Sequence, residues 1–188
     1  MKYDPSCFID EIYNLEAGGM LADLAVNPNL ILHFMGFEES DRNNALAYIK
    51  SILAECYDCG HLKVAISHEN EELYGYALMF VHPEEKYPKY LHKIFVKEQY
   101  RRSGIGTKIL SSIIDGSDVC LLCPAEKISF YEKFGFSFVQ KLETQSGDNF
   151  QLSKDLYADL CVMKTHEGTL GAPIFLLNDK DIESIIGL

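Results

Sequence analysis

An arginine- and glycine-rich turn lies between a strand-like run and a helix-like run in the middle of this chain. Residues 94–96 are apolar and strand-like, residues 101–106 read R-R-S-G-I-G, and apolar residues recur at helical spacing over residues 107–115. Gly104 and Gly106 lack a Cβ, so a ligand can approach the main chain closely. The first turn of a helix offers N–H groups without intrahelical partners and partial positive charge. This order predicts either a site for a phosphate-bearing ligand or a plain structural turn.

Two familiar glycine-rich phosphate-binding motifs differ from this turn in the spacing of their residues. A P-loop reads G-x-x-x-x-G-K-[S/T], and a dinucleotide-binding turn reads G-x-G-x-x-G. Here Gly106 is followed by Thr107, Lys108 and Ile109, without a third glycine. The turn therefore predicts neither a nucleoside triphosphate nor a dinucleotide.

Length, composition and charge limit the class of protein. The 188 residues suit one domain of ordinary size, with or without a modest extension, and 47% hydrophobic with 24% charged residues is typical of a globular protein. A formal net charge of −11 argues against nucleic acid and fits either a cationic partner or a need for solubility. The opening residues do not resemble a signal peptide, and no run of about 20 apolar residues occurs. We expect a cytoplasmic protein that does not bind membranes.

The six cysteines include two C-x-x-C pairs, Cys56 with Cys59 and Cys120 with Cys123. Two such pairs can bind zinc, but their separation far exceeds that of a compact zinc ribbon. Cys120 and Cys123 also lie in a strand-like segment, where residues three apart point to opposite faces. We predict no metal and interpret these thiols as small buried side chains in a reducing compartment.

The remaining pattern predicts an α/β (α+β) fold with a mixed, mostly antiparallel central sheet flanked by helices. Residues 1–60 have helical spacing, and residues 62–66 and 73–81 predict a hairpin. Later segments predict strands at 118–123, 136–142 and 159–164, and helices at 107–115 and 125–134. Residues 178–186 predict a short capped helix.

With this pattern, two motifs resemble the GNAT superfamily of acetyl-CoA-dependent N-acetyltransferases over roughly residues 60–164. The first is the [Q/R]-x-x-G-x-[G/A] loop, matched by Arg101, Gly104 and Gly106. The second is F-Y-E-K-x-G-F, matched by residues 130–136. The resemblance implies one GNAT-like domain over residues 1–164, with a helical acceptor-side part (1–60) and a coenzyme-binding core (61–164). Residues 165–188 form an extension, either a packed appendage or a contact for a second copy in a homodimer.

The resemblance implies acetyl-CoA as cosubstrate and assigns its binding residues. Main-chain groups of the strand residues Ile94, Phe95 and Val96 pair with the pantetheine arm. The turn binds the diphosphate through N–H groups of Arg102, Ser103, Gly104, Ile105, Gly106 and Thr107, and the side chains of Arg101, Arg102 or Lys108 either add charge or are solvated. Relatives commonly have asparagine where this chain has Pro124, which leaves one coenzyme contact in doubt.

The resemblance also implies three catalytic tasks, since the amine attacks the thioester directly. Tyr131 stands where the family has its general acid, and a main-chain N–H around Phe95 is expected to stabilise the oxyanion. Relatives often place a glutamate base on a central strand. His92 is the best candidate here, with Tyr90 assisting, because strand alternation would place Tyr90, His92 and Ile94 on one face. A structural histidine is the alternative.

The sequence thus predicts an N-acetyltransferase acting on a primary amine, with a small-molecule acceptor favoured over a protein. A CoA-binding regulatory or interaction module without turnover is the alternative, and a scaffold without coenzyme is a third reading. By resemblance the acceptor groove falls at about residues 15–60, 82–90 and 142–158. Acidic side chains there either attract a cationic acceptor or are simply solvated: Glu38, Glu39, Asp41, Glu84 and Glu85.

Overall fold

A computed structural model describes residues 5–143, 149–168 and 170–188, and it divides the chain into two compact units. The first unit contains Tyr57–Leu142 and Asp159–Phe175, with residues 5–7. The second contains Phe8–Cys56, the described part of Glu143–Ala158, and Leu176–Leu188. The single domain predicted over residues 1–164 and its extension stay predictions. Residues 1–4 and 144–148 of that domain, and residue 169 of the extension, lie outside the described residues.

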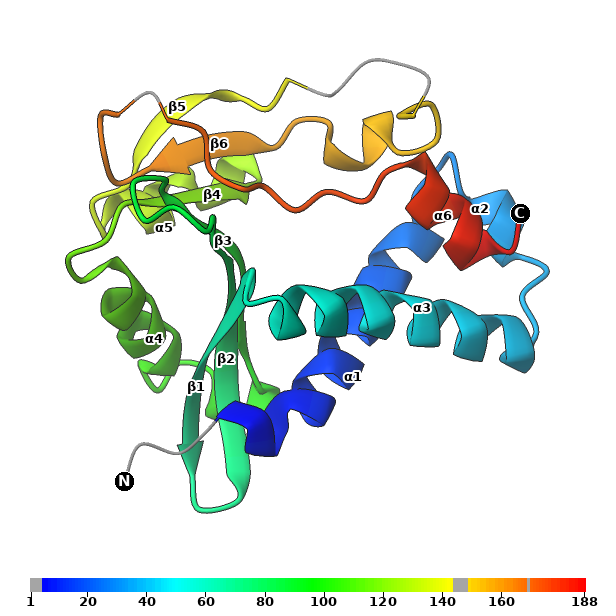
Figure 1. The fold of residues 1–188 in the computed structure, drawn as a ribbon, viewed down its shortest axis with the longest axis horizontal. Coiled ribbons are helices and arrows are strands. Elements are labelled where there is room, and N and C mark those ends of the chain that lie inside the picture. Colours follow the sequence, from blue (N-terminus) through cyan, green and yellow to red (C-terminus); the bar gives the residue numbers. More distant parts are fainter. Residues whose placement is uncertain (1–4, 144–148, 169) are drawn as a thin grey trace. The chain divides into compact units, whose positions relative to one another are not determined.

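The first unit is built on a six-stranded sheet (Figure 1). Its strands are β1 (Leu62–Glu69), β2 (Glu72–Phe80), β3 (Lys89–Val96), β4 (Val119–Cys123), β5 (Ser137–Lys141) and β6 (Cys161–Lys164), in the spatial order β1-β2-β3-β4-β6-β5. Only β3 and β4 pair in parallel, and the other four pairs are antiparallel. The predicted mixed, mostly antiparallel sheet is confirmed.

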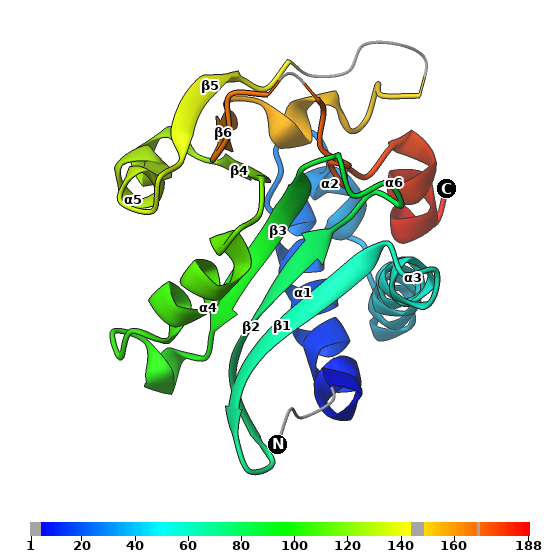
Figure 2. The same cartoon turned by 60° about the vertical axis from the view of Figure 1, so that its left-hand side comes forward.

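Two helices follow β3 and β4, and their apolar side chains pack on one face of the sheet. These are α4 (Ile105–Ile114) and α5 (Ile128–Glu132), with α4 lying beside β2 and β3 (Figure 2). Ile109, Leu110 and Ile113 from α4 share a buried core with Leu91 of β3 and Leu121 of β4. This packing holds the start of α4 close to the end of β3.

The predicted helix at 125–134 is shorter than expected. A 3-10 turn (Ala125–Lys127) precedes α5, and Gly135 ends the helix with a φ of +82°. The N–H groups of Phe134 and Phe136 both donate to the carbonyl of Tyr131, at 2.9 and 3.3 Å. Gly135 therefore makes the reversal that buries Phe136, since a left-handed residue at this place favours glycine.

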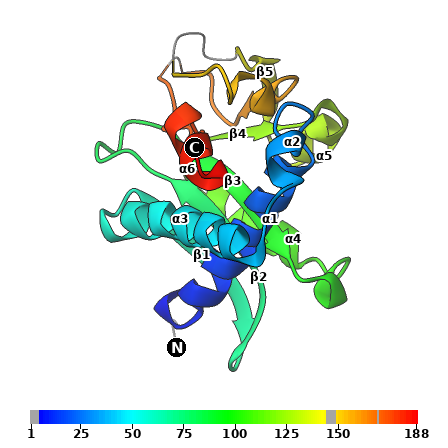
Figure 3. The same cartoon turned by 90° about the vertical axis from the view of Figure 1, so that its right-hand side faces the viewer.

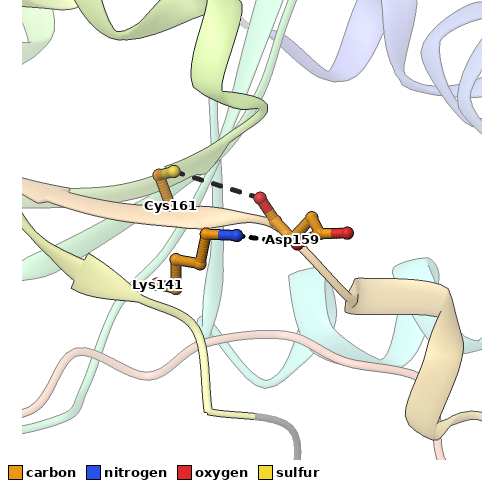
Figure 4. Close-up of polar contacts among 3 residues, drawn as sticks. All are labelled: Lys141, Asp159 and Cys161. Atoms are coloured by element: carbon orange, nitrogen blue, oxygen red, sulfur yellow. Dashed lines mark hydrogen bonds and ion pairs between the residues drawn. The ribbon is translucent and has the colours of Figure 1, made fainter.

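The last strand of the sheet, β5, is exposed along its whole length. Its residue Lys141 donates from Nζ to Oδ1 of Asp159 at 2.9 Å, and the Cys161 thiol on β6 contacts the Asp159 carbonyl at 3.9 Å (Figure 4). A bulge between Phe138 and Gln140 interrupts its pairing with β6. A bulge and a lysine on an edge strand disfavour pairing with a further strand.

The second unit is helical, as predicted for the early residues. It contains α1 (Ile9–Ala25), α2 (Ile31–Phe34), most of α3 (Glu39–Asp58) and α6 (Asp179–Ile186), which are labelled in Figure 3. The predicted cap of α6 is confirmed, since Asn178 and Asp181 form a reciprocal capping box. Among the described residues, every helix is too short or too polar to cross a membrane.

Candidate active site

The parallel strands β3 and β4 pair over three residues only and then part. The paired residues are Lys89 with Val119, Tyr90 with Cys120, and Leu91 with Leu121. Beyond Leu91, β3 continues to Val96 while still paired with β2. The second half of β3 therefore has one edge bonded to β2 and the other edge open to an added extended group.

A β-bulge at His92 changes which side chains share a face. Leu78 of β2 pairs with Lys93, whereas Met79 pairs with Leu91, so His92 is the extra residue. Tyr90 and Lys93 consequently lie on one face, and Leu91 and Ile94 on the other. The predicted alternation that grouped Ile94 with Tyr90 and His92 is wrong, because an inserted residue reverses the period-two pattern beyond it.

The open edge of β3 exposes alternate main-chain groups. The N–H of Lys97 donates to the carbonyl of Tyr74 on β2 at 2.9 Å. Alternate residues face the same neighbour, so the N–H of Phe95 also faces β2, and those of Ile94 and Val96 face the open edge. Nε of Arg101 donates to the Val96 carbonyl at 3.2 Å, as expected for an outward carbonyl. Ile94 and Val96, on either side of Phe95, are therefore placed to offer an N–H to a ligand at this edge.

The glycine turn, residues 101–106, connects this edge to α4. Arg102 and Gly104 have φ values of +65° and +82°, and α4 begins at Ile105, two residues before the predicted start. The first main-chain hydrogen bond of the helix is donated by Lys108 to Gly104, at 3.0 Å. The N–H groups of the helix's first turn precede that bond and have no partner within the helix, as an anion-binding helix start requires.

Two side chains of the turn region bond to the main chain, and two charged ones are exposed. Ser103 Oγ donates to the Tyr100 carbonyl at 2.5 Å, and Arg101 caps Val96 as described above. Arg102 and Lys108 are exposed at the start of α4. The turn can therefore offer main-chain N–H groups together with positive charge to a diphosphate.

Tyr131 is half-buried in α5 against the core of the first unit. Burial raises the pKa of its phenol above the ordinary value of 10, and the nearby Cys123 thiol acts in the same direction. The phenol is therefore protonated at neutral pH and able to donate. Its ring meets Phe136 edge-on, with centroids 5.7 Å apart.

His92 lies within a group of aromatic rings. Its ring is edge-on to Phe80 and to Phe175, with centroids 5.6 and 5.3 Å away, and Tyr90 lies at 5.8 Å. Burial lowers the pKa of His92 to about 4, and the charge of Lys93 adds to this shift. The imidazole is neutral at pH 7 and can accept a proton, but a pKa this low makes it a weak base.

The segments predicted to bind the acceptor are only partly described, since residues 144–148 lie outside the structure's described residues. In the second unit, a cavity of about 720 Å³ is lined by Leu21, Phe34, Phe37, Glu38, Glu39 and Arg42, among others. Glu38 and Glu39 are two of the acidic residues considered for a cationic acceptor. The cavity combines apolar walls with both signs of charge.

The cysteine pairs form no ligand set. None of the six cysteines, all of which are described, forms a disulfide. Cys120, Cys123 and Cys161 are buried, but Cys59 is exposed, so the predicted burial of the first C-x-x-C pair is wrong. Across the described ranges, no three His, Cys, Asp or Glu side chains converge as ligands for a metal ion. Burial raises the pKa of Cys120 and of Cys123 to about 11, so both are thiols at neutral pH.

Three residues of this region were not predicted from the sequence. Gly75 lies where a Cβ would come within 2.5 Å of the Phe95 carbonyl, Tyr100 accepts a hydrogen bond from Ser103 of the glycine turn, and the ring of Phe175 contacts that of His92. An isolated glycine inside a strand could have signalled Gly75. No local signal identifies Phe175, because its partners are more than 80 residues away in the chain.

Comparisons with known proteins agree with this geometry. Residues 60–138 match the family model of an acetyltransferase (GNAT) domain. A histone acetyltransferase HPA2 and related acetyltransferase from Corynebacterium glutamicum is similar in structure, with 14% identity, a TM-score of 0.54, and coverage of 87% of this chain and 94% of its own. No curated protein sequence matches the chain.

Two further solved structures show weaker likeness. An acetyltransferase assigned to the GNAT family, from Desulfovibrio desulfuricans, has 18% identity, a TM-score of 0.45, and coverage of 69% and 82%. A Bacillus subtilis acetyltransferase in complex with CoA has 16% identity, a TM-score of 0.44, and coverage of 61% and 82%. At these identities the structures inform on the fold alone.

The parted parallel strands, the glycine turn and the matched domain define an acyltransferase. Residues 60–138 of the chain are thus similar to an acetyltransferase (GNAT) domain, and the fold is similar to that of the Corynebacterium glutamicum acetyltransferase.

Proposed function

We propose that this protein transfers the acetyl group of acetyl-CoA to a primary amine, with a small cationic molecule as the favoured acceptor. The observation that supports it most is the open edge of β3 leading into the glycine turn. Pantetheine can pair with main-chain groups of Ile94 and Val96, while the diphosphate accepts N–H groups at the start of α4. The residues present therefore fit the coenzyme.

In the reaction, the uncharged amine nitrogen attacks the thioester carbonyl carbon, forming a C–N bond. The carbonyl oxygen gains negative charge, which the N–H of Ile94 at the open edge can stabilise. The C–S bond then breaks, and the thiolate takes a proton from the Tyr131 phenol. The phenol regains a proton released from the new amide nitrogen, so the products are an amide and CoA thiol.

Deprotonation of the acceptor is the demanding step. An alkylammonium with a pKa of about 10.4 loses its proton at neutral pH at a cost of about 4 to 5 kcal/mol. Because the pKa of His92 is about 4, a proton transfer from the ammonium group to His92 offsets little of this cost. We propose that His92 acts together with Tyr90 through water. His92, the extra residue at the bulge of β3, remains the candidate base on that strand.

The weak base favours a second candidate, a CoA-binding module without turnover. A thiol-release assay with a panel of primary amines separates the two functions. CoA formation that depends on the amine supports the transferase. Coenzyme binding by calorimetry without turnover on any amine supports the binding module, and no detectable binding at high micromolar CoA rejects both.

Tyr131→Phe tests the acid role within the transferase hypothesis. We expect kcat to fall about 100-fold, because a positioned general acid typically contributes 10²–10⁴. The Kd for CoA should change less than twofold, since the ring and its packing remain. A variant that binds CoA poorly but retains kcat would contradict the assignment.

A further inference from the structure

Tyr100 is held by hydrogen bonds at both ends, immediately before the glycine turn. Its hydroxyl donates to the Glu72 side chain on the first residue of β2, and its carbonyl accepts from Ser103 Oγ at 2.5 Å. We propose that Tyr100, anchored by Glu72, is a positioning residue that sets the geometry of the glycine turn for the coenzyme diphosphate. This inference rests on the proposed function.

The connection to the sheet begins at the β1–β2 hairpin. The rings of Tyr100 and Tyr74 lie 4.1 Å apart between centroids, and Tyr74 donates its own hydroxyl to Glu69 at 2.6 Å. The bond to Glu72 and the ring contact with Tyr74 thus join the short 3-10 helix Glu98–Tyr100 to β2. The bond from Tyr74 to Glu69 continues the connection to β1. Tyr100 is the member of this group that continues into the turn.

The connection to the turn passes through consecutive residues. The N–H of Arg101 donates to the Glu98 carbonyl at 3.1 Å, and its side chain bonds Val96. Ser103 is tied back to Tyr100, so Arg102 lies between two restrained neighbours. Arg102 has a φ of +65°, a conformation that costs a non-glycine residue free energy and persists only where the surroundings hold it.

The negative charge of Glu72 argues that this residue positions Tyr100 and does not itself bind the coenzyme. A carboxylate close to a diphosphate site opposes anion binding, so it has no direct use in holding the coenzyme. Its hydrogen bond raises the pKa of Tyr100 above 10, and the bond to Glu69 raises that of Tyr74 to about 12. Both phenols therefore keep donating across the whole range in which the enzyme would be assayed.

The test compares Tyr100→Phe with Tyr74→Phe. Both changes remove one phenol–carboxylate bond from the same surface and keep the ring, but only Tyr100 bonds a residue of the glycine turn. We expect Tyr100→Phe to raise the calorimetric Kd for CoA about three- to tenfold, as the loss of one hydrogen bond implies. The KM for acetyl-CoA should rise by the same factor with kcat changed less than twofold, and Tyr74→Phe should leave Kd within twofold.

Two Glu72 variants separate position from charge. Glu72→Gln keeps an acceptor oxygen for Tyr100, so the Kd for CoA should stay unchanged or fall slightly. Glu72→Ala should match Tyr100→Phe, and the double variant should be no weaker than either single variant. A tighter complex with Glu72→Ala would show that the carboxylate merely repels the coenzyme, and would overturn the proposal.

The inference and the proposed function can fail separately. Wild-type protein that does not bind CoA refutes the function, whereas equal Kd values for wild type and Tyr100→Phe refute the inference. A readout without coenzyme is ¹⁵N relaxation of residues 101–106. We expect lower order parameters there in Tyr100→Phe than in Tyr74→Phe, at equal melting temperatures, and unchanged order would overturn the positioning role.

Discussion

At the scale of single residues, glycines of this region serve different physical needs. Gly104 has a φ of +82°, which side chains rarely adopt, and a Cβ built there meets no atom within 4 Å. Gly75 has an ordinary φ but no space, because its Cβ would lie 2.5 Å from the Phe95 carbonyl. Gly106 has neither restriction, since its Cβ would meet Val96 at an ordinary 3.6 Å. A glycine there is consistent with the proposed approach of the coenzyme diphosphate to the main chain.

Gly104→Ala should weaken CoA binding through backbone strain. Forcing a Cβ into the left-handed region costs about 1 to 2 kcal/mol, and the turn is expected to relax and move its N–H groups. Calorimetry should show a rise in Kd of about tenfold. Gly116→Ala is the matched control, since Gly116 has a φ of +66° and equally open surroundings outside the turn. An equal effect of both variants on Kd would argue against a specific role for Gly104.

His92 should make stability depend on pH in a defined window. Its folded pKa of about 4 lies below the unfolded value of about 6.5, so the unfolded chain binds more protons between these values. The contribution of His92 to stability is therefore complete above pH 6.5 and is lost as pH falls towards 4, by about 2.5 kcal/mol at pH 4.5. Denaturant unfolding at pH 7.5 and 4.5 measures this loss, and His92→Gln should reduce it. A wild-type loss that His92→Gln leaves unchanged would assign it to carboxylates instead.

At the scale of elements, β3 combines three features that the site needs. It pairs with β2 along its length, parts from β4 after Leu91, and carries a bulge at His92. The bulge turns His92 and Tyr90 towards Phe80 and leaves Ile94 on the opposite face, with α4. One strand thus has an open main-chain edge, where we propose that the coenzyme binds, and side chains that face a different region.

Gly75→Ala tests how closely β2 controls the end of β3. The new methyl group would collide with the Phe95 carbonyl, which is main chain and cannot rotate away. We expect a loss of about 1 to 3 kcal/mol in the free energy of unfolding, typical of overpacking. CoA binding should weaken too, because the end of β3 would shift. Gly18→Ala, in a helix with no atom within 4 Å, serves as control and should not destabilise the fold.

At the scale of the whole molecule, the two compact units draw on segments that are distant in the chain. The first unit holds the sheet, the glycine turn and Tyr131, and every residue proposed to contact the coenzyme. One cluster of its buried apolar residues includes side chains of α4, and residues of α5 pack against it. Coenzyme binding should therefore stabilise this unit directly.

Ligand-induced stabilisation offers a measurement on the complete chain. A ligand that binds only the folded state adds about 2.7 kcal/mol at a concentration 100 times its Kd. We expect CoA to raise the melting temperature by several degrees, and Gly104→Ala to shift this response to higher concentration. Pantetheine, which lacks the diphosphate, should be a much weaker stabiliser. Equal shifts for CoA and pantetheine would argue that the glycine turn contributes nothing.

Local sequence determined the glycine turn and the helix that follows it. The apolar run, the glycine turn and the apolar helix follow one another within about 25 residues, so the turn and α4 were predictable from neighbouring residues. The F-Y-E-K-F-G-F segment is likewise a short local motif. Helix caps depend on neighbouring residues, which explains why the α6 cap was also predicted. The strands of the mixed sheet were predicted from apolar patterns within each segment.

The tertiary structure decided what depends on distant partners. The bulge at His92 arises from pairing with β2, so strand alternation read from the sequence predicted the wrong face for Ile94. The low pKa of His92 comes from burial among Phe80, Tyr90 and Phe175, which converge from three segments of the chain. Strand register and burial are long-range properties, because each requires contacts that no local pattern contains.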